Sequence, residues 1–286
     1  MTKTTTVLAI LISLLVSIAL GQYWREDDYR RGYRRGYGRG FQRPEDPNRD
    51  RNGVPDWDKD QEFKHDVFTF VRVEYTSGYG RRGGGGNWAT DYPDSDLNFS
   101  YRLQELTSMK VDPNGKILKL TDPEILDYPF IYIIEPGRMS LMEEEVQGLR
   151  KYCENGGFVM VDDFWDEDEW YVFREEMRRV FPNKEPKELP LEHEIFHCVY
   201  DLKEKPQIPS INHYRGGRRT EAWHDTEPHY RAIFDDEGRI MMLICHNTDL
   251  GDGWEREGED PGYFKEYSEK WAYPLGINIV TYAMTH

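Results

Sequence analysis

Three short apolar segments of this sequence each end in residues that can perform acid–base or metal chemistry. The segments are residues 130–134, 158–161 and 240–245. The residues that follow them are Glu135, then Asp162 and Asp163, then His246, Asn247 and Asp249. Ligands of open α/β sheets bind beyond the carboxyl ends of the strands, so we expect these side chains to meet at one rim. Trp88 and Asp91, in the loop after the first predicted strand, are expected to join them.

Carboxylates and an imidazole at one rim can hold a divalent metal, or can supply a general acid and a general base. The metal ligands that this pattern predicts are Asp162, Asp163 and His246. In the alternative interpretation, Asp162 and Asp163 cap the following helix and His246 satisfies a loop carbonyl. Acids that converge from separate loops repel one another unless something binds them, which favours a ligand site. A divalent metal is the candidate cofactor, and its identity stays open.

The residues that must position this rim alternate between short apolar strands and amphipathic helices from Asp66 onward. The expected strands are residues 67–75, 117–120, 130–134 and 158–161, with a pair at 230–234 and 240–245. The expected helices begin at Asp96, at Ser140 (as a capping box with Glu143) and at Asp166 or Asp168, with a last helix at 271–284. This alternation predicts one α/β domain over residues 66–286, with three layers and a mainly parallel sheet covered by helices on both faces.

The first 21 residues have the pattern of a secretory signal peptide. Lys3 precedes an apolar run from Val7 to Leu20, and Ala19 and Gly21 are small residues at −3 and −1 of a cleavage site. The run is shorter than the roughly 20 residues of a spanning helix, although an uncleaved membrane anchor is the alternative. We therefore expect export to the periplasm or cell envelope. Cys153, Cys198 and Cys245 do not form a disulfide framework, and we expect buried free thiols.

Residues 22–65 are rich in Arg, Tyr and Gly and lack hydrophobic periodicity. Such a segment cannot bury enough surface to fold alone, so it is predicted to be a disordered linker. The alternative is an arm that grips an anionic polymer or a membrane surface. The net charge of −16 argues against nucleic acid as a partner of the whole chain.

Within this linker, Asn48, Asp50 and Asn52 place oxygen side chains at alternate positions, Gly53 stands sixth and Asp56 ninth. Calcium loops begin in this way, and the stretch is similar to one thrombospondin type 3 calcium repeat. The twelfth position holds Lys59 instead of an acid. A polar turn is therefore the preferred interpretation of the candidate calcium loop.

A second metal motif is His193-Glu194-Ile195-Phe196-His197, which has the H-E-x-x-H spacing of zinc proteases. Glu221 and Asp225 are candidate third ligands. Pro190 and Gly216-Gly217 interrupt the helices that such a site requires, so a buried or loop histidine pair is favoured.

From about Phe68 to His286 the sequence resembles the bacterial domain-of-unknown-function family 4159. The matching stretches are Tyr128-Pro-Phe130 with Glu135-Pro-Gly137, Gly156-Gly-Phe158 with Asp162-Asp163-Phe164, His246-Asn-Thr-Asp249 continuing to Trp254-Glu255, and Tyr273-Pro-Leu-Gly276-Ile-Asn278. The resemblance implies a three-layer, flavodoxin-like fold of the class I glutamine-amidotransferase type. True amidotransferases end the strand after the Gly-Gly turn in a nucleophilic Cys, whereas this chain has Asp162 and Asp163 there.

Three functional hypotheses follow. The first is an exported, non-thiol and non-catalytic domain that binds an unknown ligand or envelope protein. The second is a metal-assisted hydrolase in which Asp162, Asp163, His246 and Asp249 hold the ion and Glu135 is the general base. In the third, the domain is a scaffold whose polar rim only caps helices.

Overall fold

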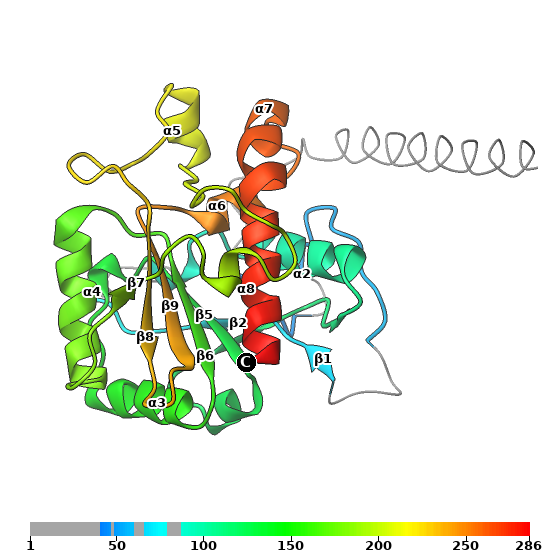
Figure 1. Cartoon of the computed structure of the whole chain (residues 1–286). Coiled ribbons are helices and arrows are strands. Elements are labelled where there is room, and N and C mark those ends of the chain that lie inside the picture. Colours follow the sequence, from blue (N-terminus) through cyan, green and yellow to red (C-terminus); the bar gives the residue numbers. More distant parts are fainter. Residues whose placement is uncertain (1–40, 47–48, 60–65, 79–86) are drawn as a thin grey trace, which may run out of the picture.

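A computed structural model describes residues 41–46, 49–59, 66–78 and 87–286 of the chain (Figure 1). The predicted signal peptide, and the Arg/Tyr/Gly-rich segment before Phe41, lie outside these residues. Among the described helices, none combines the length and the apolar character that crossing a membrane requires.

The centre of the molecule is a seven-stranded, mostly parallel sheet. In spatial order its strands are β4 (Lys116–Leu118), β2 (Val71–Val73), β5 (Phe130–Ile134), β6 (Phe158–Asp162), β9 (Ile240–His246), β8 (His229–Phe234) and β7 (Lys187–Glu188). The pairs from β4 to β9 are parallel, and β8 runs antiparallel to both β9 and β7. A separate short pair joins β1 (Val67–Phe68) to β3 (Lys110–Val111).

Helices cover both faces of the sheet. They are α2 (Asp94–Leu106), α3 (Glu143–Glu154), α4 (Asp166–Val180), α5 (Ile211–Arg215), α6 (Leu250–Glu255), α7 (Pro261–Tyr263) and α8 (Tyr273–Thr285), with a π-helix at Phe264–Ala272 between the last two. Short 3₁₀ helices lie at Asn87–Ala89, Pro123–Asp127, Pro136–Arg138 and Glu194–Phe196.

The pleat of the strands divides the apolar side chains into two cores. On β5, Tyr132 and Ile134 face a core that contains Phe99 of α2, Trp254 of α6 and residues of α8. Ile131 and Ile133 face the opposite core, where α3 and α4 pack. Successive side chains of a strand point to opposite faces, so a strand that is apolar throughout must be buried on both. The predicted mixed α/β architecture with a mainly parallel sheet is confirmed.

The strand boundaries agree with the prediction most closely in the middle of the sheet. Phe130–Ile134 is the strand predicted, and the strand pair predicted at 230–234 and 240–245 forms β8 and β9, which are antiparallel. The expected single strand over residues 67–75 is divided, because β1 pairs with β3 whereas β2 pairs with β4 and β5.

The predicted capping box at Ser140 and Glu143 is wrong. The Ser140 N–H donates to the carbonyl of Thr76, and Met139 bridges Ser77, so this stretch is still extended. Helix α3 begins at Glu143, and the carboxylate of Glu145 accepts from the Met142 N–H at 2.7 Å. Similarly, α2 begins at Asp94, while the predicted cap Asp96 lies in the first turn.

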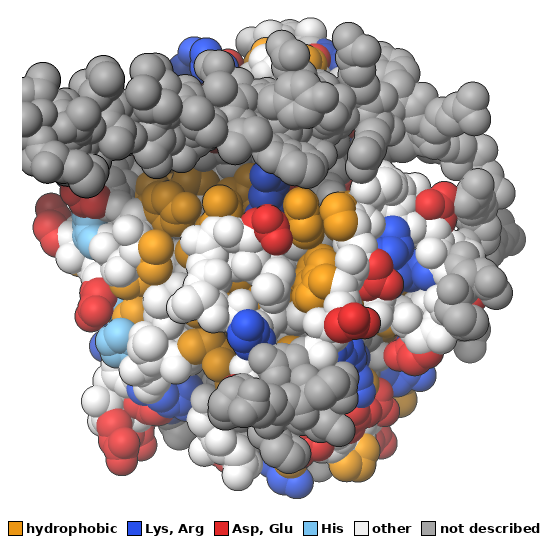
Figure 2. All heavy atoms as spheres, turned by 90° about the vertical axis from the view of Figure 1, so that its right-hand side faces the viewer, with side chains coloured by type: hydrophobic (Ala, Val, Ile, Leu, Met, Phe, Trp, Pro, Cys, Tyr) orange, Lys and Arg blue, Asp and Glu red, His pale blue; other side chains and the backbone are white. Residues whose placement is uncertain are grey.

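Part of the segment predicted to be a linker packs on the domain. Phe41 contacts the rings of Trp88 and Tyr92, and the Trp57 indole N–H donates to the Val111 carbonyl at 2.8 Å. Arg49 is buried and donates to the Asn114 carbonyl. Figure 2 views the molecule from the side on which residues 41–59 lie in Figure 1, and hydrophobic side chains are exposed on this face. The composition of the segment did not predict this attachment.

Candidate functional site

A cavity of about 340 Å³ lies beyond the carboxyl ends of β5, β6 and β9. In Figure 1, α5 and α6 lie at this end of the sheet. The residues that line the cavity are Thr90, Asp91, Glu135, Arg138, Asp163, Trp165, Glu169, Ser210, Glu221, Asp249, Asp252 and Arg256. Seven carboxyl groups thus face two guanidinium groups, which makes the cavity strongly acidic.

Asp91, Asp163 and Asp249 bring carboxylates from three separate elements to one point. Asp163 follows β6, Asp249 lies between β9 and α6, and Asp91 lies in the loop before α2. One oxygen of each lies within 4.8 Å of the others. Oδ2 of Asp91 is shut off from solvent and has no hydrogen-bond partner among the described residues.

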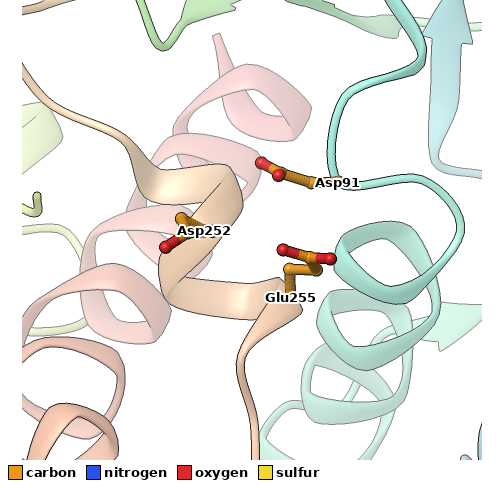
Figure 3. Close-up of side chains that lie close together, drawn as sticks. All are labelled: Asp91, Asp252 and Glu255. Carbon is orange, nitrogen blue, oxygen red and sulfur yellow. The ribbon is translucent and has the colours of Figure 1, made fainter. Parts of the chain in front are cut away.

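Asp91 also belongs to a second carboxylate group, which Figure 3 shows. Asp252 and Glu255 belong to α6 and Asp91 to the loop beside it, and one oxygen of each of the three lies within 4.8 Å of the others. Asp91 therefore lies between two sets of acids.

Burial and mutual repulsion raise the pKa of each of the three converging aspartates well above its usual range. For Asp91, the largest cause is burial, followed by the charges of Glu255 and Asp252. Burial is also the largest cause for Asp163 and for Asp249, and nearby carboxylates add to it. Carboxyl groups in this position either hold protons or need a cation, because the charged forms repel one another.

Backbone strain is concentrated around the cavity. Six non-glycine residues have positive φ within the described ranges, and three of them, Asp91 (62°), Glu135 (47°) and Asp163 (57°), line the cavity. Asp166 and Asn247, both at 59°, hold the loop beside it. Left-handed conformations of non-glycine residues cost about 1–3 kcal/mol each and cluster at functional sites.

Arg72 on β2 positions the loop that carries Asp91. Its fully buried guanidinium donates to the carbonyls of Trp88 (3.0 Å) and Thr90 (2.9 Å) and pairs with Asp96. Trp88 itself is buried in the core on the α3/α4 face and does not line the cavity.

Asp162 lies behind the cavity and supports the start of α6. Its Oδ2 accepts from the Tyr132 hydroxyl and from the Gly251 N–H, both at 3.0 Å. Neither predicted acid caps α4, which begins at Asp166, and Asp163 accepts instead from the Trp165 indole N–H at 2.8 Å. Asp162 is the last residue of β6, whereas Asp163 follows the strand with a left-handed φ of 57°, and this turn brings Asp163 to the cavity while Asp162 stays behind it.

His246 is directed away from the cavity. Its ring packs against Phe164 and Trp170, Nδ1 accepts from Arg231 at 3.1 Å, and Nε2 donates to the Asp166 carbonyl at 3.1 Å. Burial lowers the pKa of His246 to about 4, so the imidazole is neutral near pH 7. The predicted metal set of Asp162, Asp163 and His246 is therefore not brought together, and the loop-carbonyl interpretation describes His246.

Asn247 positions the loop over residues 220–227. Its side-chain amide donates to the carbonyls of Asp225 (2.8 Å) and Glu227 (3.0 Å) and accepts from the Asp166 N–H. Asp166 in turn accepts from the backbone of Trp223 at 2.9 Å. These contacts hold the loop that brings Glu221 to the cavity.

Several lining residues were missed at the sequence level, namely Arg138, Glu169, Ser210, Asp252 and Arg256, together with Glu255 of the second carboxylate group. Asp252 and Glu255 lie inside a stretch that carries the family resemblance, and that resemblance could have indicated them as site residues. Glu221 was considered only for the zinc motif.

The H-E-x-x-H motif at residues 193–197 and the candidate calcium loop do not form metal sites among the described residues. His193 and His197 flank a single 3₁₀ turn, and the His197 ring nitrogens contact Asp201 and the Leu191 carbonyl. In the candidate calcium loop, Asn48 lies outside the described residues. Asp50 accepts from the Asn52 N–H, the Asn52 side chain donates to Asp94, and Asp56 accepts from the Trp57 N–H.

All three cysteines are free thiols, and none lines the cavity. Cys153 and Cys245 are buried, and burial raises the pKa of both thiols. A thiolate is therefore not available at this site.

The sequence profile of a family described as a domain of unknown function (DUF4159) matches residues 69–284. The chain belongs to this family. The match spans every strand of the main sheet and every residue that lines the cavity. No curated protein sequence matched the chain.

The pKa of Asp162 yields a stability prediction. Burial raises the pKa of this carboxyl to about 7 from an ordinary value near 3.8. The folded state therefore binds the proton more tightly than the unfolded state, and this stabilisation is lost as the pH rises from about 4 through 7. For Asp162→Asn, we expect the fall in unfolding free energy between pH 4.5 and pH 8 to be smaller than in the wild type by about 3 kcal/mol.

Urea denaturation in the presence of a chelator, at both pH values, measures this difference. Asp127→Asn, at an exposed position, is the matched control and should leave the wild-type difference unchanged. An unchanged difference in Asp162→Asn would show that Asp162 is ionised in the folded protein at both pH values.

Proposed function

We propose that this protein is an exported, non-thiol binding domain of the bacterial cell envelope. In this proposal, Asp91, Asp163 and Asp249 hold a divalent cation, and the cation takes part in binding a small ligand in the remaining cavity. Export rests on the pattern of the first 21 residues.

The observation that carries the proposal is the convergence of these three carboxylates within 4.8 Å, with Oδ2 of Asp91 buried and without a hydrogen-bond partner within the described part of the chain. Oxygens on opposite sides of a Ca²⁺ ion, each about 2.3–2.6 Å from it, are about 5 Å apart, and neighbouring ligands are closer. The spacing therefore fits a single ion. A set of carboxylates alone favours Mg²⁺, Ca²⁺ or Mn²⁺ over softer metals.

The cavity has room for more than an ion. Its volume of about 340 Å³ is within the range of small-ligand pockets. Thr90, Ser210 and Trp165 add two hydroxyl groups and an aromatic wall to the acidic lining. Because ionised carboxylates only accept hydrogen bonds, the lining favours a ligand that is rich in donors or that coordinates the cation.

The parallel strands and the strained turn at Asp163 also support a relationship to the class I amidotransferase fold. In that class the corresponding strand ends in a nucleophilic cysteine, and here an aspartate occupies the position. A binding role through carboxylates accounts for this difference.

Calorimetric titration of the purified, chelator-treated protein with Ca²⁺ and Mn²⁺ tests the proposal. We expect saturable binding and a rise in melting temperature, since an ion at 100 times its Kd stabilises the folded state by about 2.7 kcal/mol. Asp163→Asn should abolish both effects, whereas Asp168→Asn, at an exposed position on α4, should retain them. Absence of binding, together with no change in melting temperature on chelation, would refute the cation site.

A second candidate function is metal-assisted hydrolysis. Glu135 favours it, because this residue lines the same cavity in a left-handed conformation and can act as a general base toward a cation-bound water. In this case Glu135→Gln would abolish Mn²⁺-dependent hydrolysis of p-nitrophenyl acetate or phosphate and would retain Mn²⁺ binding. If the wild type hydrolyses neither compound at saturating Mn²⁺, the binding function is favoured.

A further inference from the structure

The second carboxylate group, formed by Asp91, Asp252 and Glu255, has the spacing of a cation site but already contacts a positive charge. Nε of Arg256 lies 2.9 Å from Oδ1 of Asp252 and 2.6 Å from Oε2 of Glu255. The other oxygen of Asp252 accepts from the Ile211 N–H. Only 2% of Asp252 is exposed, so its charge is screened chiefly by the protein and not by water.

The Arg256 guanidinium is held by contacts of both Nε and Nη1. Arg256 follows Glu255 at the end of α6, and its Nη1 lies 3.4 Å from Oε2 of Glu259. The guanidinium also lines the acidic cavity. An arginine keeps its charge at every accessible pH, so it is a permanent counter-ion for the acids it contacts.

We infer that Arg256 fills the second cation position of the acidic cavity and thereby limits the site to one divalent ion. This inference rests on the proposed cation site at Asp91, Asp163 and Asp249. Asp91 then lies between a bound ion on one side and, on the other, two acids whose charge is partly balanced by a guanidinium.

The two carboxylate groups differ in the positive charge that balances them. Arg256 contacts both Asp252 and Glu255. In the described structure, no guanidinium contacts both Asp163 and Asp249 in this way. Removing the positive charge of Arg256 should therefore leave Asp252 and Glu255 in need of a cation, in a geometry that can accept one. Two ions that share a carboxylate lie about 3.5–4 Å apart in two-metal sites.

Mn²⁺ titration followed by calorimetry and electron paramagnetic resonance tests the inference. We expect the wild type and Arg256→Lys to bind one Mn²⁺ with an uncoupled signal. Arg256→Gln should bind two, with a spin-coupled signal from neighbouring ions. The double variant Arg256→Gln with Glu255→Gln should return to one ion, because the second group then loses a ligand.

Stability gives an independent readout. Without metal, Arg256→Gln should melt at a lower temperature than the wild type, and excess Mn²⁺ should raise its melting temperature more than that of the wild type. If Arg256→Gln folds only when Mn²⁺ is present, the inference is also supported.

The results that would overturn the inference are distinct from those that would overturn the cation site itself. Two ions in the wild type, or one ion in Arg256→Gln, would contradict the role of Arg256 while leaving the first site intact. An Arg256→Gln protein that stays unfolded in Mn²⁺ would do the same. Failure of the wild type to bind any Mn²⁺ would refute the cation site.

Discussion

Replacing Asp91 with asparagine should weaken divalent-cation binding by at least about a hundredfold and should stabilise the metal-free protein. Loss of a residue that only hydrogen-bonds to a metal ligand already costs metal sites about 10–100-fold in affinity, and Asp91 is expected to contact the ion directly. The metal-free protein gains stability because the charges of Asp252 and Glu255, which raise the pKa of Asp91, then face a neutral amide.

Titration calorimetry with Ca²⁺ measures the affinity, and urea denaturation in chelator measures the stability. Asp168→Asn serves as the control for the loss of one exposed negative charge. Unchanged Ca²⁺ affinity in Asp91→Asn would contradict the site, whereas a destabilised metal-free variant would indicate that Asp91 has a structural role only.

The largest stability effect is expected at Arg72, on β2, whose side chain is fully buried. Arg72→Met should reduce the unfolding free energy by about 3–5 kcal/mol, because it leaves the buried carboxylate of Asp96 without its partner. The buried guanidinium contacts Asp96 through Nε at 3.1 Å, and it also donates to the carbonyls of Trp88 and Thr90. Cation affinity should fall as well, since these carbonyls belong to the loop that carries Asp91.

Urea denaturation of Arg72→Met and of the exposed control Arg219→Met tests this expectation. The Arg219 side chain is 84% exposed and lies 3.6 Å from Glu266, so its loss should cost less than about 1 kcal/mol. Combining Arg72→Met with Asp96→Asn should recover part of the loss, because no unpaired charge then remains. Equal effects at Arg72 and Arg219 would show that the buried ion pair does not support the fold.

The sequence predicted where the site would lie and four of the residues that line it, namely Asp91, Glu135, Asp163 and Asp249, but it also placed Trp88, Asp162, His246 and Asn247 there, which do not line the cavity. Apolar runs such as residues 130–134 identify buried strands, and their carboxyl ends must meet at one edge of a parallel sheet. The choice between Asp162 and Asp163, however, depends on the residue at which the strand ends. Asp162 belongs to β6 and supports α6, whereas Asp163 follows it in a left-handed conformation and faces the cavity.

His246 and Asn247 illustrate the same limit. Both follow an apolar strand, yet His246 packs on Phe164 and donates to the Asp166 carbonyl, and Asn247 holds the loop over residues 220–227. Their roles depend on contacts with segments about 20–80 residues away, which periodicity does not encode.

Residues brought from distant loops could not be assigned from spacing. Glu221 reaches the cavity because Asn247 and Asp166 fix its loop, and Asp252 and Glu255 face Asp91 only after α6 packs on α2. The start of α3 was predicted wrongly for a similar reason. The Ser140 N–H donates to the Thr76 carbonyl, and this long-range contact keeps Ser140 extended, so that the helix begins further along the chain.

The most direct measurement of the central claim is anomalous diffraction from a crystal of the protein soaked in Mn²⁺. We expect one strong peak, about 2.0–2.6 Å from carboxylate oxygens of Asp91, Asp163 and Asp249. The absence of a peak in the cavity at saturating Mn²⁺, or a peak that contacts none of these three aspartates, would contradict the claim.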